Sequence, residues 1–281
     1  MTAVEEAAAP GPVVLQPRQL IVTLYGLYAR ERGGWLSVAA VVRLMADLGV
    51  EEAAVRSSIS RLKRRGLLDA RRDGDVAGYA LTAEALEVLA EGDARIFGRR
   101  RAQEDDGWLI VVFSVPESER ERRHRLRSEL SHLGFGTVAP GVWIAPGHLG
   151  DEVHEVLRRR GLSGYVELFS RARVPREEAR AAVPRWWDLD ALHSRYAAFL
   201  DRHAPARHRA HPDRALDPAE AFADHVRLVT DWRGLPYADP GLPLELLPAD
   251  WNGARAADLF AELAERLAGP AGEHARRLLD A

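Results

Sequence analysis

The 281-residue sequence has no cysteine, and Lys63 is the one lysine among its 39 basic residues. Without cysteine the chain forms no disulfide and offers no thiolate nucleophile or metal ligand, which fits a reducing cytoplasm. No apolar run approaches the roughly 20 residues that cross a bilayer, so we expect no membrane partner. The acidic start lacks the basic-then-apolar order of a signal peptide. We therefore expect a disordered tail over residues 1–17.

Enzyme signatures are also missing. The sequence contains no glycine-rich dinucleotide motif, phosphate loop, G-x-S-x-G elbow or HExxH helix. His203, His208 and His211 invite a metal site, but they fall in a stretch without regular periodicity, where exposed histidines are common. We predict a protein that is not an enzyme, with no cofactor and no metal. Acid–base pairs assembled from distant residues stay open.

The residues present are close to the globular average, at 47% hydrophobic and 29% charged. A chain of this length favours two or three domains over a single core. The net charge of −3 hides an asymmetry, because residues 11–101 carry a net +4 and residues 102–281 a net −5. A basic first third is compatible with an anionic partner.

The first third has the pattern of three short helices. The first begins near Pro17 and ends at Gly33-Gly34, and the second follows Ser37 as N-cap and ends at Leu48-Gly49. Its expected buried residues are Val38, Val41, Val42 and Met45. The third helix runs from Glu51 to about Arg65, with Val55, Ile59 and Leu62 as its buried stripe.

The opposite face of that third helix places small hydroxyl residues between long cations. These residues are Arg56, Ser57, Ser60, Arg61, Lys63 and Arg64. Short side chains let a helix axis approach the floor of the major groove, and arginines reach guanine edges or phosphates. A solvated basic face is the alternative interpretation of the same pattern.

A hairpin with two adjacent arginines follows and favours DNA binding. Leu67–Arg72 and Tyr79–Leu81 are typical of strands, joined by a turn over Asp73–Gly78. Three helices followed by a hairpin that carries Arg71 and Arg72 predict a winged helix-turn-helix over residues 18–101. Thr82 then caps a further helix, with Leu86 and Leu89 as its apolar positions.

The middle, residues 107–173, alternates strands and helices. Trp108–Val115 is expected to be a strand buried on both faces, followed by a helix over Glu117–His132. Further strands are expected at Phe135–Thr137, Val142–Ile144 and Tyr165–Phe169, with a helix over Asp151–Arg160. The order β-α-β-β-α-β predicts a ferredoxin-like domain.

The last third, residues 174–281, is predicted to be a helical effector region, which makes the whole chain α+β. One helix is expected to start at Pro184, a loose stretch to cover Arg202–Asp217, and two helices to close the chain at Ala254–Leu267 and Glu273–Leu279. Trp186, Trp187, Trp232 and Trp251 could line a ligand cavity, although such tryptophans more often anchor helix packing. Arginines of the middle helix, Arg122 and Arg123 among them, either form a solvated face or contact the phosphates of an effector or of DNA.

The chain resembles PaaX-type repressors, which control phenylacetate degradation, over nearly its whole length. In the first third the matching segments are Leu48-Gly49-Val50, Ala54-Val55-Arg56, Ser60-Arg61-Leu62, Arg65-Gly66-Leu67-Leu68, Tyr79-Ala80-Leu81-Thr82 and Arg95-Ile96-Phe97. In the last third they are Trp187-Asp188-Leu189, Asp239-Pro240, Leu242-Pro243, Leu246-Leu247-Pro248 and Trp251.

The resemblance implies a homodimeric repressor that binds double-stranded operator DNA and is released by an aryl-acyl coenzyme A. From the arginines of the middle helix and the tryptophans of the last third, we expect Arg122, Arg123, Trp186 and Trp187 to bind the effector. The middle domain would resemble a small CRISPR-adaptation nuclease, whose metal-dependent members carry an aspartate near the end of the first strand. Here that stretch is Phe113-Ser114-Val115-Pro116, without a carboxylate. We therefore expect a structural, dimerising domain, with a metal-dependent nuclease as the alternative function and a protein-binding winged helix as a third.

Overall fold

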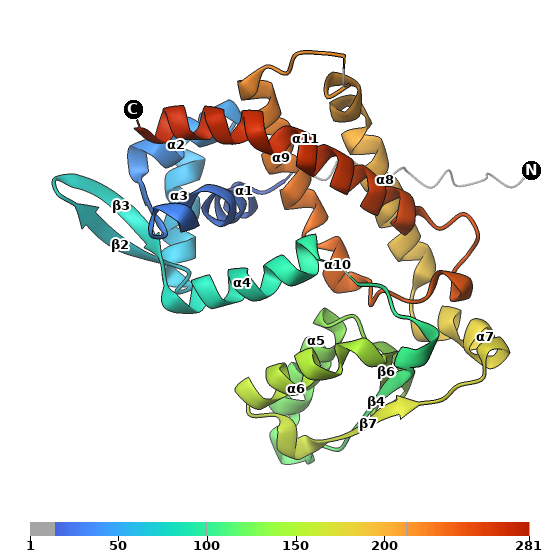
Figure 1. The fold of residues 1–281 in the computed structure, drawn as a ribbon. Helices are drawn as coiled ribbons and strands as arrows, with labels where there is room; N and C mark the ends of the chain where they lie inside the picture. Colours follow the sequence, from blue (N-terminus) through green and yellow to red (C-terminus); the bar gives the residue numbers. More distant parts are fainter. Residues whose placement is uncertain (1–14, 99, 212, 281) are drawn as a thin grey trace, which may run out of the picture. The chain divides into compact units, whose positions relative to one another are not determined.

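The computed structural model describes residues 15–98, 100–211 and 213–280 and divides into two compact units (Figure 1). Unit 1 comprises the chain through Glu87 together with Asp217–Thr230 and the residues from Leu267 onward. Unit 2 comprises Val88–Leu216 and Asp231–Arg266. Most of the tail expected over residues 1–17 lies outside the described residues. None of the helices in the described ranges is both long enough and apolar enough to cross a bilayer.

Unit 1 begins with the three expected helices. Helix α1 (Pro17–Leu24) continues through a π-helical turn, η1 (Tyr25–Ala29), and a 3-10 turn, η2 (Arg30–Arg32). The Ser37 hydroxyl accepts a hydrogen bond from the Ala40 amide at 3.0 Å and so caps α2 (Val38–Asp47), as predicted. Helix α2 buries Ala40, Val41, Leu44 and Met45, which confirms Val41 and Met45 of the predicted stripe, whereas Val38 and Val42 are only partly buried. Apolar residues occupy most of this helix, and periodicity alone does not fix its rotation.

A three-stranded antiparallel sheet completes the first part of unit 1. Helix α3 (Glu52–Arg64) leads into β2 (Leu68–Asp73) and β3 (Val76–Leu81), and the strand order is β1-β3-β2. The turn of the hairpin is only Gly74-Asp75, shorter than the one predicted, because Asp73 pairs directly with Val76. Strand β1 (Trp35–Ser37) was predicted to be a link. The hairpin extends away from the helices of unit 1 (Figure 1).

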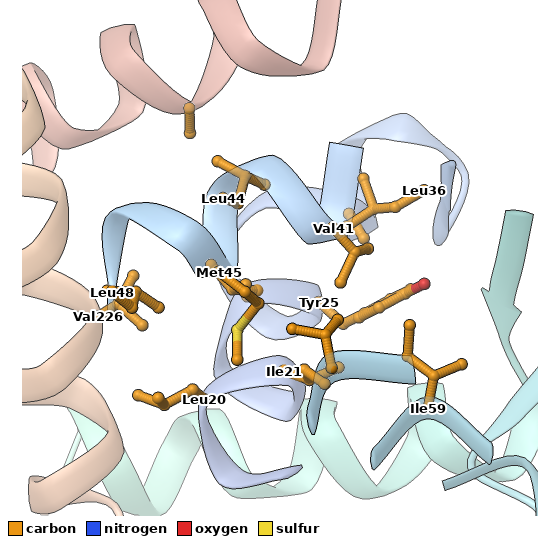
Figure 2. Packing of buried hydrophobic residues seen from close by; sticks show 14 of the residues in the cluster. Leu20, Ile21, Tyr25, Leu36, Val41, Leu44, Met45, Leu48, Ile59 and Val226 are labelled. Carbon is orange, nitrogen blue, oxygen red and sulfur yellow. The ribbon is translucent and has the colours of Figure 1, made fainter. Parts of the chain in front are cut away.

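The core of unit 1 also includes residues from the end of the chain. Leu20, Ile21, Tyr25, Val41, Met45 and Ile59 pack together, and Val226 lies beside Leu48 (Figure 2). Val226 belongs to α9 (Pro218–Trp232), and Ala271 and Ala275 of α11 (Asn252–Asp280) reach the same core. Polar contacts support this packing: Thr230 donates to Thr23 at 2.8 Å, and Arg43 donates to the Leu278 carbonyl at 2.9 Å. Helices α9 and α11 therefore cover α1 and α2.

Helix α11 is a single helix, so the prediction of two closing helices was wrong. Gly269-Pro270 is typical of a break, and proline inside a helix costs about 3 kcal/mol. Fully buried residues nevertheless continue at four-residue spacing through Leu263, Leu267, Ala271 and Ala275. Their burial outweighs the cost of Pro270.

Helix α4 (Ala83–Phe97) follows the hairpin and crosses the boundary between the two units. The Thr82 hydroxyl accepts from the Ala85 amide at 3.1 Å and caps it, as predicted. Ala85 is its buried residue in this turn, whereas Leu86 is 38% exposed, contrary to expectation.

Unit 2 contains a four-stranded antiparallel sheet with strand order β5-β6-β4-β7. The elements follow one another as β4 (Trp108–Phe113), α5 (Arg120–His132), β5 (Gly136–Ala139), β6 (Val142–Pro146), α6 (Gly150–Arg159) and β7 (Val166–Ala172). Leu109 and Val111 of β4 pack with Leu126, Leu130 and Val153 of α5 and α6 on one face. On the other face Val112 is 37% and Phe169 54% exposed, so β4 is not buried on both faces as predicted.

Two further helices of unit 2 differ from the prediction in their ends. Helix α7 (Arg176–Trp186) stops before Asp188, whose carboxylate accepts from the Ala191 amide at 2.9 Å and caps α8 (Leu189–Arg209). The prediction of one helix starting at Pro184 was therefore wrong. Helix α8 also continues past Pro205, so the loose stretch begins only after Arg209. Helix α10 (Leu235–Ala238) is a single turn.

Candidate nucleic-acid interface

Helix α3 has one buried and one cationic face. Val55, Ile59 and Leu62 are at most 4% exposed and hold the helix against the core of unit 1. Because each residue advances the helix by about 100°, the residues between these positions point the other way. The exposed ones include all six that the sequence singled out, Arg56, Ser57, Ser60, Arg61, Lys63 and Arg64. The structure therefore brings this set together on one surface, here called the α3 face.

The cations of the α3 face are only weakly engaged. Arg56 pairs with Glu52 one turn earlier, at 2.6 Å between Nη2 and Oε1. An exposed pair at this spacing contributes about 0.3–0.5 kcal/mol, so Arg56 can exchange Glu52 for another anion. Within the described residues Arg61, Lys63 and Arg64 form no ion pair. Three guanidinium or ammonium groups are thus available to a phosphate or a base edge.

The β2–β3 hairpin is anchored beside the α3 face by three side chains. Trp35 donates from Nε1 to the Arg71 carbonyl at 3.1 Å, and its ring lies over Gly78, where a Cβ would come within 2.5 Å. Tyr25 donates to the Tyr79 carbonyl at 3.1 Å, and Thr82 to the Gly66 carbonyl at 2.8 Å. Sequence reasoning missed the role of Trp35; the signal was the alternation of Trp35-Leu36-Ser37.

Arg71 and Arg72 are both exposed on the hairpin but do not share a face. Successive residues of a strand point to opposite sides, so the side chains of Arg71 and Arg72 leave β2 on opposite faces. Arg72 curls back over the turn and donates to the Asp75 carbonyl at 2.6 Å. Arg71 forms no ion pair within the part of the chain that the structure describes. The geometry makes Arg71 the more available of the two cations.

A partly buried polar pair in unit 1 joins η1 to α9. Tyr28 and His225 approach to 3.3 Å between Oη and Nδ1, and Tyr28 also packs on Phe222. Burial raises the pKa of Tyr28, which keeps its hydroxyl protonated and able to donate. Burial lowers the pKa of His225 from 6.5 to about 4, so His225 is neutral at pH 7.

The four residues expected at an effector are not brought together. Arg122 donates to the Tyr165 hydroxyl at 2.6 Å, and Arg123 donates to the Val115 carbonyl and to Glu117, both at 2.9 Å. Arg122 and Arg123 both lie on α5, the helix that packs on the same face of the sheet as the Leu109 side chain.

The two tryptophans pack on the opposite face of the sheet. Trp186 and Trp187 lie against Trp108, and the Trp187 Nε1 donates to the Gly134 carbonyl at 2.8 Å. Trp232 stacks on Phe260 at 4.6 Å between ring centroids. These contacts favour helix packing over a ligand cavity as the role of Trp186, Trp187 and Trp232.

The three histidines also differ in their surroundings. His203 is buried on α8, with its Nε2 3.0 Å from Asp231 Oδ2, and Arg202 pairs with the same carboxylate. Burial raises the pKa of Asp231, but the hydrogen bonds from His203 and Arg202 outweigh it and lower the pKa overall. His208 and His211 are exposed. In the described ranges no three His, Asp or Glu side chains are grouped to hold a metal ion.

Comparison with known proteins gives three family matches along the chain. Residues 16–85 match the "PaaX-like protein" model, residues 101–183 the "PaaX protein central Cas2-like domain", and residues 187–277 the "PaaX-like protein C-terminal domain". The transcriptional repressor PaaX of Escherichia coli (strain K12) is 28% identical over 267 residues, which cover 92% of this chain and 83% of that protein.

A solved structure shares the fold. The uncharacterized protein Rv0674 from Mycobacterium tuberculosis matches with a TM-score of 0.62 and 24% identity, covering 94% of this chain and all of that one.

The sequence matches define the class of protein as a transcriptional regulator. The chain belongs to the PaaX family of transcriptional repressors, which confirms the resemblance inferred from its sequence motifs.

Proposed function

We propose that this chain is a ligand-responsive repressor that binds double-stranded operator DNA through unit 1. The observation that carries the proposal is the α3 face, which sets exposed arginines among small serines directly before a hairpin that carries Arg71 and Arg72. Helices α9 and α11 cover α1 and α2, and they leave this face uncovered among the described residues. In this interpretation α3 is the recognition helix of a winged helix-turn-helix and the β2–β3 hairpin is its wing.

The residue roles follow from distance to the groove floor. Ser57 and Ser60 are short and let α3 approach the bases, while Arg56 and Arg61 reach base edges. Arg64, Lys63 and the hairpin cations Arg71 and Arg72 lie nearer the backbone and contact phosphates. Relatedness to a transcriptional repressor supports a regulator over an enzyme.

The central sheet of unit 2 is proposed as the homodimer module, with a ferredoxin-like arrangement. The strand order β7-β4-β6-β5 supports this arrangement. The sheet face opposite α5 and α6 exposes Val112, Val138 and Phe169, and a second copy would bury them. Replacing Phe169 by glutamate should shift the protein from dimer to monomer in sedimentation. A dimer of unchanged stability would place the interface elsewhere, and Val88→Glu on the exposed side of α4 is the matched control.

The effector and the target operon are proposed from the family alone. An aryl-acyl coenzyme A would release the repressor from the operator of a phenylacetate-type catabolic operon. Arg122 and Arg123 take part only if they leave their present partners, Glu119 and Glu117.

The test is footprinting on the DNA upstream of the protein's own coding region. We expect a protected palindrome whose half-sites lie about 34 Å apart or a multiple of that, with protection lost on adding phenylacetyl-CoA. Arg61→Ala should raise the protein concentration needed for protection roughly 5- to 150-fold. Arg125→Ala, on α5, should leave the footprint intact. Cleavage of the same DNA on adding Mg²⁺ or Mn²⁺ would instead favour the nuclease alternative.

A further inference from the structure

A pocket in unit 2 is lined by neither the α3 face nor Arg122 and Arg123, and Trp108 is the tryptophan that lines it. It has a volume of about 890 Å³, in the range of small-molecule sites. Its walls come mainly from three segments, residues 102–108, residues 171–179 and residues 243–246, and Pro146 of β6 completes the lining. The walls are tied together, because the Ala102 amide donates to the Gly241 carbonyl at 2.8 Å and Arg101 donates to the Leu242 carbonyl at 3.2 Å.

Arg171 enters this pocket through an unusual backbone conformation. Its φ of 55° is the one positive value outside glycine in the described ranges. The pairing of β4 with β7 also shifts here: Trp108 pairs with Ala172 and Ile110 with Phe169, so Leu109 alone faces Ser170 and Arg171. Such a bulge redirects a side chain, and strained backbone of this kind clusters at ligand sites.

The neighbouring backbone is fitted closely to this bulge. A Cβ on Gly107 would come within 3.1 Å of the Arg171 Cα. On the same wall, Asp106 accepts from the Gln103 amide at 2.8 Å and pairs with Arg100 at 2.7 Å. Gly107 therefore leaves room for the backbone of Arg171 to pack directly against it.

Charges around the pocket are separated by segment. Arg171, Arg173 and Arg176 all belong to the segment between β7 and the first turn of α7. Glu104, Asp105 and Glu245 belong to the other two segments. None of these six side chains forms an ion pair within the described residues, and all three arginines are exposed. Trp108, Val174 and Leu246 add apolar wall between the two sets.

We propose that this pocket binds a phosphorylated nucleoside, either free or as part of a larger coenzyme. Arginine forks match phosphate oxygens in a bidentate manner, so Arg171, Arg173 and Arg176 hold the phosphates. Glu104 and Asp105 accept hydrogen bonds from the exocyclic amine of the base, whose flat ring lies on the apolar wall. As the effector site of the regulator, the pocket rests on the proposed function.

The test uses calorimetry on the full chain without DNA, with ATP, coenzyme A and inorganic pyrophosphate as probes. Arg171→Gly and Arg173→Ala should each weaken nucleotide binding roughly 10- to 100-fold, the usual loss for a hydrogen bond between charged groups. Glycine adopts a φ of 55° more readily than arginine, so Arg171→Gly should keep or raise the melting temperature. Arg125→Ala removes an equally exposed arginine from α5 and should change nothing.

The outcomes separate the two ligand sources. Binding of both ATP and coenzyme A supports the shared chemistry, and binding of one alone identifies the source. No binding, or wild-type affinity in both arginine variants, would overturn the proposal. Pyrophosphate that binds as tightly as ATP would overturn the role of Glu104 and Asp105. A chain that binds nucleotide here but leaves no footprint would contradict the proposed repressor and not this site.

Discussion

The buried His225 should make the stability of unit 1 depend on pH in a measurable way. His225 is 6% exposed, its Nδ1 accepts from Tyr28, and burial lowers its pKa from 6.5 to about 4. In the unfolded chain the same imidazole binds a proton near pH 6.5, whereas in the folded protein it stays neutral down to about pH 4. Unfolding therefore takes up a proton in this window, and acid favours it.

The size of the effect follows from the two pKa values. Each pKa unit corresponds to about 1.4 kcal/mol, so the full difference is about 3 kcal/mol. The contribution of the neutral His225 to the free energy of unfolding is fully present above pH 6.5. About 2 kcal/mol of this free energy is lost when the pH falls from 7 to 5.

The assay compares the wild type with His225→Gln, which cannot titrate. Urea unfolding followed through native-state hydrogen exchange of α1 and α2 reports unit 1 by itself. The variant should be less stable at pH 7, because glutamine packs poorly beside Phe222, but its loss between pH 7 and pH 5 should be about 2 kcal/mol smaller. His208→Gln, exposed on α8, is the control and should follow the wild type. Equal acid sensitivity in His225→Gln and the wild type would refute the reasoning.

Three further predictions concern the DNA. Arg61→Ala should relax sequence preference by ~1–3 kcal/mol per site, while Arg64→Ala should weaken specific and non-specific binding alike; unchanged affinity in both folded variants would remove α3 from the groove. Replacing Arg71 and Arg72 by alanine should reduce the slope of log K against log salt by ~0.9 for each phosphate that the hairpin no longer neutralises, and a wild-type slope would place the hairpin off the DNA. Saturating operator should weaken thioester binding by the factor by which thioester weakens operator binding, roughly 5- to 150-fold for a typical coupling; equal calorimetric affinities with and without operator would mean no coupling.

Local signals predicted the elements well where one interaction dominates. Ser37 and Thr82 cap their helices as expected, because a hydroxyl at this position accepts a hydrogen bond from an amide of the first helical turn. In α8 and α11 the prediction placed a loose stretch or a break around a proline. Pro205 and Pro270 instead lie inside helices that tertiary packing stabilises. The sequence pattern does not contain that packing energy, so it placed breaks where the chain continues.

The candidate sites likewise divide into features that local sequence predicts and features that depend on tertiary contacts. The α3 face was predictable because helical periodicity alone assigns Arg56, Ser60 and Arg64 to one side. The partner of Trp35, the bulge at Arg171 and the burial of His203 depend on contacts between segments far apart in sequence. Arg122 and Arg123 were predicted either to form a solvated face or to contact phosphates, and in the structure they pair with Glu119 and Glu117.

The scarcity of lysine has a consequence for how such a protein could be switched. The one lysine side chain of this sequence, Lys63, is exposed on α3. Acetylation or any other lysine-directed modification of a side chain must therefore fall on the proposed recognition helix. Acetylation would remove one positive charge from the α3 face and leave unit 2 untouched. An amine-reactive dye attached to the Lys63 side chain would report operator binding from the helix itself.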